Sequence, residues 1–391
     1  MLRNRFFLSI DKPFNSEGGF KKVLQREIFE NFNVQGEFIS AHIHGNGHIN
    51  DTFLVKTNNN GEVMQYILQR INHRVFKDID GVMNNIDIVT SHVNNTLPNN
   101  TFQQIIKTND NKNYYFCNKT YTYWRVYTFV ENGMSLEDIT DPIQFYETGL
   151  AFGEFQKNIQ ALNSNNIVET ILDFHNTKKR FENLKLSIQN DLVERAALAK
   201  DEIDYLLEKK DYASVIVDLL EEKKIPYRIT HNDTKLNNVI FDRTTGKALS
   251  VIDLDTIMPG SILYDFGDAI RYGANKGKED DFNLENVGID LHLFELFTQG
   301  FLEHTFSIMN SYEIDNLAFS SLLMTYELAM RFLEDFLNGD TYFKVDDDRH
   351  NLRRTKAQIA LMKDIEKNLK TMEKIVKKIY LNCLNGNCSQ K

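Results

Sequence analysis

The sequence predicts an α+β protein with an antiparallel-sheet N-terminal region, residues 1–130, and a mainly helical C-terminal region, residues 131–391. Three observations support this prediction. Apolar and polar residues alternate in short runs over residues 38–130, as in strands with one buried face. After Pro142, apolar residues recur at helical spacing along most of the chain. The length of 391 residues exceeds one ordinary domain and allows a sizeable core.

The N-terminal region is expected to contain a five-stranded antiparallel sheet and one helix. The segments GEFISAHIHGNG, INDTFLVKT and EVMQYILQRI alternate, and NNNG between the last two predicts a hairpin turn. TFQQIIKT and NYYFCN form a second predicted hairpin, followed by the β-rich run TYWRVYTFV. Residues 81–93 place their apolar side chains at helical spacing, so a helix interrupts the strands.

The C-terminal region is expected to contain helices on both sides of a short insert. Residues 225–255 combine a polar loop with short apolar strands. Helical periodicity covers residues 144–161, 173–188, 196–208, 213–222, 289–305, 314–337 and 349–380.

Composition limits the partners and the cellular compartment. Lys and Arg total 45 and Asp and Glu total 55, and the net charge of −10 disfavours non-specific binding to nucleic acids or anionic membranes. The three cysteines predict neither a disulfide framework nor a zinc site, as in a reducing compartment. The apolar run of residues 6–10 is shorter than a signal-peptide core, and no run reaches transmembrane length. We therefore expect a cytoplasmic protein, whose oligomeric state the sequence leaves open.

The clearest chemistry lies in the segment THNDTKLNNVIFD and in the apolar run after it. His231, Asp233 and Asn238 form an H-x-D-x-x-x-x-N pattern, and Asp253 and Asp255 follow the next strand. The Asp233 carboxylate can accept a proton from an alcohol. The oxygens of Asn238, Asp253 and Asp255 suit Mg²⁺. Each residue alone could make a turn or a cap, but together they provide what phosphoryl transfer requires.

This pattern resembles the aminoglycoside phosphotransferase and choline kinase superfamily, a branch of the protein-kinase-like fold. The resemblance extends over residues 38–380. It implies ATP and Mg²⁺ as cofactors, Asp233 as the catalytic base and His231 as the residue that orients it. It also implies Asn238 and Asp253 as magnesium ligands, with Asp255 on a second magnesium.

The D-F-G sequence in YDFGDAIR comes too late in the chain to provide the metal ligand. The superfamily pattern instead implies that Asp265 begins a helix and supports the catalytic loop, through His231 or through the loop backbone. The sequence also departs from the superfamily at Leu254, where an aromatic residue often follows the metal carboxylate.

The candidate nucleotide-binding residues lie in the N-terminal region. Gly45 and Gly47 precede a strand, where glycines let backbone N–H groups approach phosphates, although hairpin turns use the same residues. The third strand lacks the kinase lysine and offers Arg70, which can bind a phosphate or face solvent. The resemblance places the hinge at residues 129–131, where the backbone near Glu131 would bind adenine. Which residue replaces the lysine stays open.

Four segments resemble the N-acetylhexosamine 1-kinases: GNGHINDTF, YILQRINHRVF, VIDLDTIMPG with YDFGDAIR, and ELAMRFLEDFLNGDTYFKV. Those enzymes use ATP to phosphorylate the anomeric hydroxyl of GlcNAc or GalNAc. The resemblance implies His48, Arg331 and Tyr342 as sugar contacts. Glu327 is a further candidate, because Glu327, Arg331 and Asp335 share one helix face. These charges could instead pair with one another along an exposed helix.

Two other functions remain open. A kinase for another hydroxyl compound, such as an aminoglycoside or choline, would need an acidic or aromatic pocket, against which Arg331 argues. A nucleotide-binding pseudokinase-like protein would explain the missing lysine, but the set of Asp233, Asn238 and Asp253 argues against it. Trp124, the single tryptophan, could pack in the core or stack on a sugar. The sequence does not identify the preferred epimer or the pathway.

Overall fold

The computed structural model describes residues 18–45, 49–96 and 102–388. Contacts divide the chain into two compact units. The first unit comprises Met1–Val75 and Ile105–Phe129, and the second comprises Phe76–Gln104 and Val130–Lys391. The sequence analysis placed residues 76–104 with the N-terminal region, whereas their contacts place them with the helical unit. The reason is that the apolar face of this helix packs on residues that follow much later in the chain.

The first unit is an antiparallel six-stranded sheet that packs against one helix. The strand order is β1-β2-β3-β6-β4, and β5 pairs with a different part of β6. The sheet has six strands rather than five, and the two strands of the second predicted hairpin, β4 and β5, each pair with β6 instead of with each other. The elements are α1 (Gly18–Phe29), β1 (Glu37–Ile43), β2 (Asp51–Asn59), β3 (Glu62–Ile71), β4 (Ile105–Ile106), β5 (Tyr115–Cys117) and β6 (Thr122–Thr128).

The turn between β2 and β3 explains the register of the sheet. Asn60 and Gly61 both have positive φ, 53° and 97°, which matches the right-handed twist of a two-residue hairpin. The predicted NNNG turn is therefore confirmed. With this register, Phe53 and Leu68 face the apolar core beside α1, together with Trp124. Trp124 is only 3% exposed, so it is a core residue rather than a sugar-stacking one.

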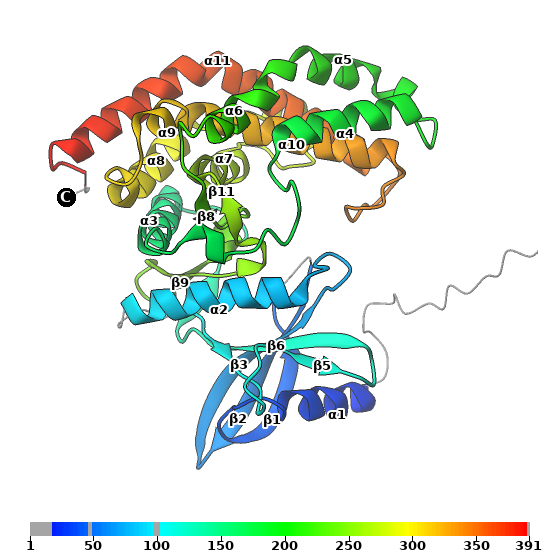
Figure 1. Cartoon of the computed structure of the whole chain (residues 1–391), viewed down its shortest axis with the longest axis vertical. Coiled ribbons are helices and arrows are strands. Elements are labelled where there is room, and N and C mark those ends of the chain that lie inside the picture. Colours follow the sequence, from blue (N-terminus) through cyan, green and yellow to red (C-terminus); the bar gives the residue numbers. More distant parts are fainter. Residues whose placement is uncertain (1–17, 46–48, 97–101, 389–391) are drawn as a thin grey trace, which may run out of the picture. The chain divides into compact units, whose positions relative to one another are not determined.

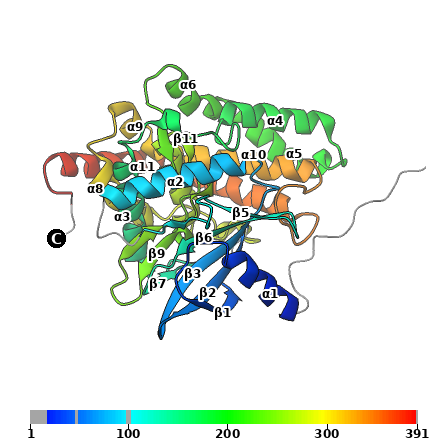
Figure 2. The same ribbon diagram turned by 60° about the horizontal axis from the view of Figure 1, so that its bottom comes forward.

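The second unit is mainly helical and contains two small sheets, β10-β9-β7 and β11-β8. Figure 2 shows β7 and β9 side by side. All the helices predicted from periodicity are present, with small shifts at their ends. The elements are α2 (Ile79–Thr96), β7 (Gly133–Ser135), α3 (Pro142–Ile159), α4 (Thr177–Asn190), α5 (Lys200–Glu208), α6 (Val215–Glu221), β8 (Arg228–Thr230), β9 (Val239–Asp242), β10 (Ala248–Val251), β11 (Met258–Gly260), α7 (Ile262–Gly273), α8 (Leu291–Thr305), α9 (Ser311–Asp315), α10 (Leu317–Leu337) and α11 (His350–Leu384).

Helix packing in this unit follows from capping and from small residues. The Asp141 side chain caps α3, and Pro142 fits the first turn because its missing N–H needs no partner. Gly149 and Gly153 of α3 lie against the backbone of α8, where an added Cβ of Gly149 would be 2.4 Å from a carbonyl oxygen. The buried helix α10 packs against α4, α7 and α11 (Figure 1). In the described ranges no helix, α11 included, is long and apolar enough to span a membrane.

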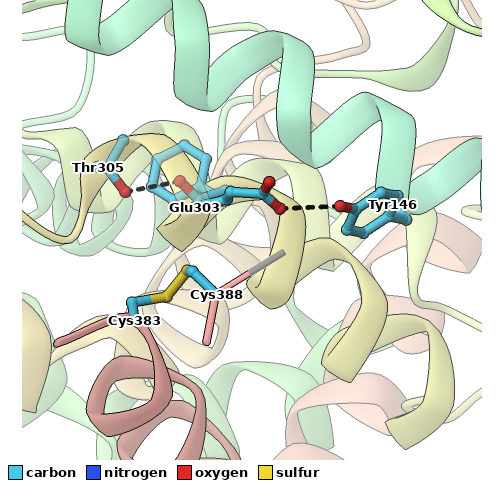
Figure 3. Close-up of a disulfide and its surroundings, with 6 residues drawn as sticks. Tyr146, Glu303, Thr305, Cys383 and Cys388 are labelled. Carbon is cyan, nitrogen blue, oxygen red and sulfur yellow. Dashed lines mark hydrogen bonds between the residues drawn. A yellow bond between two sulfur atoms is a disulfide. The ribbon is translucent and has the colours of Figure 1, made fainter. Parts of the chain in front are cut away.

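A disulfide closes the C-terminal end of α11. Cys383, at the end of the helix, is bonded to Cys388 (Figure 3). The expectation that these cysteines form no disulfide is therefore wrong, because the chain turns back after α11 and brings them together. Cys117 is a free buried thiol in the first unit. Near the disulfide, the Tyr146 hydroxyl donates to Glu303 Oε2 at 2.8 Å (Figure 3), which joins α3 to α8.

Candidate active site

The predicted catalytic loop connects β8 to β9 in the second unit. β8 pairs with β11, and β9 pairs with β10, so both ends of the loop are fixed by strands. Between them the chain makes a 3₁₀ turn at Leu236–Asn238. Short strands and a tight turn hold polar side chains at defined positions, as a rigid site requires.

Asp233 lies in this loop between two donors. Lys235 Nζ is 2.7 Å from Asp233 Oδ1, and Asn238 Nδ2 donates to Asp233 Oδ2 at 3.0 Å. Burial alone would raise the pKa of Asp233, but the Lys235 ammonium and these hydrogen bonds outweigh it and lower the pKa. The Asp233 side chain is still 28% exposed. Asp233 is therefore an accessible carboxylate near neutral pH, which can accept a hydrogen bond or a proton.

Lys235 is a residue that the sequence analysis missed. Its signal was its position two residues after Asp233 in HNDTK. Burial would lower the pKa of Lys235, but Asp233, Asp268 and Glu279 raise it, so the amine stays charged. The Lys235 ammonium also lies 5.9 Å from the centre of the Tyr272 ring. A fixed cation beside Asp233 can neutralise negative charge that develops on a transferred group.

His231 holds the loop rather than offering a free ring nitrogen. Its Nε2 lies 2.9 Å from the carbonyl oxygen of Ile252, and the Asp233 backbone N–H donates to its Nδ1 at 3.2 Å. These contacts define the tautomer with the proton on Nε2. The ring is fully buried against Phe152 and Phe155. His231 therefore suits the predicted role of orienting Asp233.

Asp265 supports the same loop from the start of α7, as the sequence analysis expected. Its carboxylate accepts hydrogen bonds from the backbone N–H groups of His231, at 2.9 Å, and Asn232, at 2.7 Å. Gln156 Nε2 donates to it at 2.7 Å as well. Asn232 has a φ of 64°, a left-handed conformation that this carboxylate helps to stabilise. Burial raises the pKa of Asp265, against the effect of His231 and the backbone donors.

The chain segments that carry Asn238 and Asp253 are joined by a backbone hydrogen bond. The Ile252 N–H donates to the Asn238 carbonyl at 2.9 Å, so Asn238 and Asp253 lie on neighbouring chain segments. Asp253 is exposed and left-handed, with φ 61° and ψ 57°. Because Asn238 Nδ2 is bonded to Asp233, its amide oxygen is the atom that can bind a metal. Asp255, by contrast, is 3% exposed.

This donor set fits Mg²⁺, which commonly takes one or two protein oxygens and completes its shell with phosphates and water. Among the described residues, no group of three or more His, Cys, Asp or Glu side chains could hold a metal by itself. Asn238 and Asp253 would supply two protein oxygens to such an ion. Whether Asp255 binds a second ion stays a prediction.

The candidate nucleotide-binding residues are only partly described. Gly47 and His48 lie outside the described residues. Gly45 has a φ of 70°, and a Cβ there would meet nothing within 4 Å. Arg70 lies opposite Asp51 in the β2–β3 ladder and forms an ion pair with it. Glu131 is exposed in the segment between β6 and β7.

A second polar cluster surrounds Arg331 of α10. Arg331 Nη1 lies 3.5 Å from Glu327 Oε1. The guanidinium carbon of Arg331 lies 5.1 Å, 5.8 Å and 5.7 Å from the ring centres of Phe174, Tyr342 and Phe343. The structure thus brings together three of the four predicted sugar contacts, Glu327, Arg331 and Tyr342. Tyr342 is 59% exposed, so one side of this aromatic cluster is open to solvent.

Asp335 does not continue this row of charges. Its carboxylate accepts the backbone N–H groups of Thr341, Tyr342 and Phe343 at 2.8–2.9 Å. The alternative of charges that pair along an exposed helix is confirmed only for Glu327 and Arg331, because α10 is buried and Asp335 turns toward the next loop. Asp335 fixes the backbone that carries Tyr342.

His175 and Arg180 belong to the same cluster, and no pattern in the sequence indicated them. His175 Nδ1 lies 3.0 Å from both carboxylate oxygens of Glu327. Arg180 donates from two nitrogens to the carbonyl oxygen of Phe174, at 3.1 Å and 2.9 Å. Burial lowers the pKa of Arg180, and the nearby Arg331 lowers it further. His175 precedes α4 and Arg180 lies in its first turn, and both reach α10 only through tertiary packing.

Solved structures with similar folds are small-molecule kinases by their descriptions. A microcompartment-associated aminopropanol kinase aligns with a TM-score of 0.57 and 14% identity, covering 90% of this chain and 98% of the other. For an aminoglycoside phosphotransferase from Alicyclobacillus acidocaldarius the TM-score is 0.59 and the identity 12%, and the alignment covers 90% of this chain and 96% of the other. For a choline kinase from Cryptosporidium parvum the TM-score is 0.58 and the identity 14%, and the alignment covers 92% of this chain and 99% of the other. At this identity the likeness concerns the fold, which is protein-kinase-like.

The sequence itself is matched by a family model. The model described as "Phosphotransferase enzyme family" covers residues 40–286, which is more than half of the chain. The matched range includes the catalytic loop, the Asn238–Asp253 pair and Asp265. The match shows that the chain belongs to this phosphotransferase enzyme family, which is that of the aminoglycoside phosphotransferases.

Proposed function

We propose that the protein transfers the γ-phosphoryl group of ATP to the anomeric hydroxyl of an N-acetylhexosamine, GlcNAc or GalNAc, and forms the 1-phosphate. The reaction needs a proton acceptor at the sugar hydroxyl, cations at the phosphates and a site for a neutral polyol. In the reaction, the sugar oxygen bonds to the γ-phosphorus, the bond to the β,γ-bridging oxygen breaks, and ADP leaves. The hydroxyl proton goes to a base.

The catalytic loop supplies the base in this proposal. Asp233 Oδ1 or Oδ2 accepts the proton of the anomeric hydroxyl, because its lowered pKa keeps it ionised. Asn238 and Asp253 would hold a magnesium ion, which would supply charge neutralisation at the phosphates of ATP. Lys235 keeps a second positive charge next to Asp233. His231 and Asp265 hold the loop in place.

The nucleotide contacts are a further part of the proposal. The backbone near Gly45 and Gly47 would approach the phosphates, and the backbone near Glu131 would bind adenine. Arg70 would replace the kinase lysine, although its ion pair with Asp51 already offsets its charge. ADP is bound in a related solved structure, a spectinomycin phosphotransferase with a TM-score of 0.52 and 12% identity.

The observation that carries the choice of acceptor is the charge of the Arg331 cluster. Two buried or half-buried guanidiniums, Arg180 and Arg331, accompany the fully buried carboxylate of Glu327 and the half-buried one of Glu334. A cationic acceptor such as choline would meet like charge there, which is unfavourable in a partly desolvated site. A neutral sugar can instead accept from Arg331 and lie against Tyr342. His48 would be an additional sugar contact.

A substrate panel tests the proposal. The purified protein with ATP and Mg²⁺ is offered GlcNAc, GalNAc, glucosamine, aminoglycosides, choline and amino alcohols, and the products are identified by mass and by ³¹P NMR. We expect a hexosamine 1-phosphate, whose phosphorus couples to the anomeric proton, and a rate of product formation at least about a hundredfold lower with Asp233→Asn as the matched control. Phosphorylation of a cationic acceptor alone would refute the sugar assignment. ATP binding without transfer to any acceptor would favour the pseudokinase. The expected cytoplasmic location also remains a prediction.

A further inference from the structure

A buried histidine–carboxylate pair joins the predicted site residue Glu327 to a residue that was not predicted, His175. His175 precedes α4, and its Nδ1 faces both oxygens of Glu327 on α10 at 3.0 Å. The side chains of His175 and Glu327 are 7% and 1% exposed. Glu327 also lies 3.5 Å from Arg331. The carboxylate thus connects His175 to the proposed sugar contact.

The other ring nitrogen of His175 has no partner. Among the described residues, His175 Nε2 is buried and makes no hydrogen bond. His175, Arg331 and Arg180 lower the pKa of Glu327 against the effect of burial, so Glu327 is ionised and can only accept. Nδ1 must therefore carry the proton, and in the neutral ring Nε2 is a lone-pair acceptor. A buried acceptor without a partner is unfavourable, so the group calls for an explanation such as a water, an ion or a functional contact.

The position of His175 relates it to the catalytic loop as well. Its ring lies 5.1 Å from that of Tyr264, and the next residue, Asp265, holds the backbone that precedes Asp233. On the other side, the ring contacts Phe174 at 4.5 Å, which itself lies against Arg331. His175 therefore lies between the supports of the proposed base and the proposed sugar contacts.

We infer that His175 is a specificity-determining residue that forms a hydrogen bond through Nε2 to a ring hydroxyl of the acceptor. Glu327 orients the imidazole by accepting from Nδ1, and Arg331 shares that carboxylate. A hydroxyl group can donate to the neutral ring, whereas an amide or acetyl oxygen can only accept. The inference rests on the proposed function, because it concerns the acceptor of the same reaction.

Two substitutions separate this role from a structural one. In His175→Asn the amide nitrogen can still donate to Glu327, but nothing reaches the position of Nε2. In His175→Gln the longer side chain reaches that position. We expect His175→Asn to raise the KM for the acceptor about three- to tenfold, as for the loss of one hydrogen bond, with the KM for ATP unchanged. His175→Gln should recover part of the loss.

A set of monodeoxy acceptors tests which group makes the contact. With the wild-type protein, removal of one particular ring hydroxyl should raise the KM by a similar factor, and with His175→Asn the same removal should have no further effect. Wild-type acceptor kinetics in His175→Asn, or an unchanged penalty for every deoxy acceptor, would overturn the inference.

A measurement on the wild-type protein covers the case that neither variant folds. In ¹H–¹⁵N spectra of the imidazole nitrogens, saturating acceptor should shift the His175 Nε2 resonance and leave Nδ1 in place. Unchanged nitrogen shifts at saturation would refute the contact. The two proposals fail separately, because a wild-type protein that phosphorylates a cationic acceptor but no hexosamine refutes the proposed function. In that case the KM for the cationic acceptor is compared between the wild type and His175→Asn. An unchanged KM in His175→Asn would refute the inference as well.

Discussion

Asp253 and Asp265 give the sharpest test of the site, because both are aspartates near the catalytic loop and only one is proposed to bind metal. We compare Asp253→Asn with Asp265→Asn, which remove the same charge and keep the same shape. Asp253 is exposed, and asparagine tolerates its left-handed φ of 61° as well as aspartate does. Asp265 is buried and accepts three hydrogen bonds. Asp265→Asn should therefore lower the melting temperature, whereas Asp253→Asn should change the dependence of turnover on Mg²⁺.

The magnitude for Asp265→Asn follows from its hydrogen bonds. The amide oxygen can keep the Asn232 N–H, and the side chain of Gln156 can turn over to accept from the new NH₂ group. The His231 N–H then faces a donor, and an unsatisfied buried donor costs about 1–3 kcal/mol. Relief of the burial that raises the pKa of Asp265 offsets part of this cost. With about 2–4 °C per kcal/mol for a large domain, we expect Tm to fall by roughly 2–10 °C.

For Asp253→Asn we expect a melting temperature within about 1–2 °C of wild type, as for an exposed substitution that changes the free energy of unfolding by less than about 0.5 kcal/mol. The loss should appear in the metal dependence. Turnover should fall at least about tenfold, and the Mg²⁺ concentration for half-maximal rate should rise, because a ligand carboxylate is lost. Calorimetry and a magnesium titration of the initial rate measure both quantities. A magnesium defect in Asp265→Asn with none in Asp253→Asn would show that the metal ligand is assigned to the wrong aspartate.

Four further predictions concern single residues. Asp233→Asn should lower kcat about 10²–10⁴-fold with ATP binding intact in calorimetric titration, and turnover within twofold of wild type would remove Asp233 as the base. Lys235→Met should raise the pKa of Asp233, so the acidic limb of the kcat/KM profile should move to higher pH; an unmoved limb would show that Lys235 does not act on the base. Arg331→Ala should reduce kcat/KM for the sugar about ten- to hundredfold with the KM for ATP unchanged, whereas normal sugar kinetics with a lower Tm would make Arg331 a structural residue. The pKa of Glu327 is lowered in the folded state, so its contribution to the free energy of unfolding is complete above the ordinary carboxyl pKa of about 4.3 and is lost as the pH falls below it. Glu327→Gln should thus be less stable than wild type at pH 7 in urea unfolding, and the gap should narrow toward pH 3; a gap independent of pH would contradict the lowered pKa.

Local patterns predicted much of the fold. The hairpin at Asn60 and Gly61 depends on backbone conformations that few residues adopt, and the helices of the second unit depend on a periodicity visible within each segment. Two features depended on tertiary packing or on the path of the chain rather than on a local pattern, and they were not predicted. The assignment of Phe76–Gln104 to the helical unit follows from packing with later residues, and the Cys383–Cys388 disulfide follows from the path of the chain after α11.

The same distinction applies to the site. Asp233, Asn238 and Asp253 lie on one strand–loop–strand segment, so their spacing alone indicated that they act together. Asp265 was expected near the loop, and its hydrogen bonds to the loop backbone confirm that. His175 was missed, because it comes from a different segment that α4 and α10 bring to Glu327. A buried polar residue of this kind has no sequence pattern, since its partner is fixed only by helix packing.

The charges around Arg331 constrain more than the choice between a sugar and a cation. Burial raises the pKa of Glu334, while Arg180 and Arg331 lower it, whereas the pKa of the fully buried Glu327 is lowered. Glu327 is already engaged by His175 and by Arg331, and an ammonium group on the acceptor would have to compete with both. A neutral hydroxyl needs no such competition, because it can donate to an imidazole nitrogen and accept from a guanidinium at once. Discrimination against cationic acceptors should therefore weaken in Arg331→Ala and Arg180→Ala alike, even though Arg180 donates to the backbone of Phe174 and is not proposed to touch the sugar.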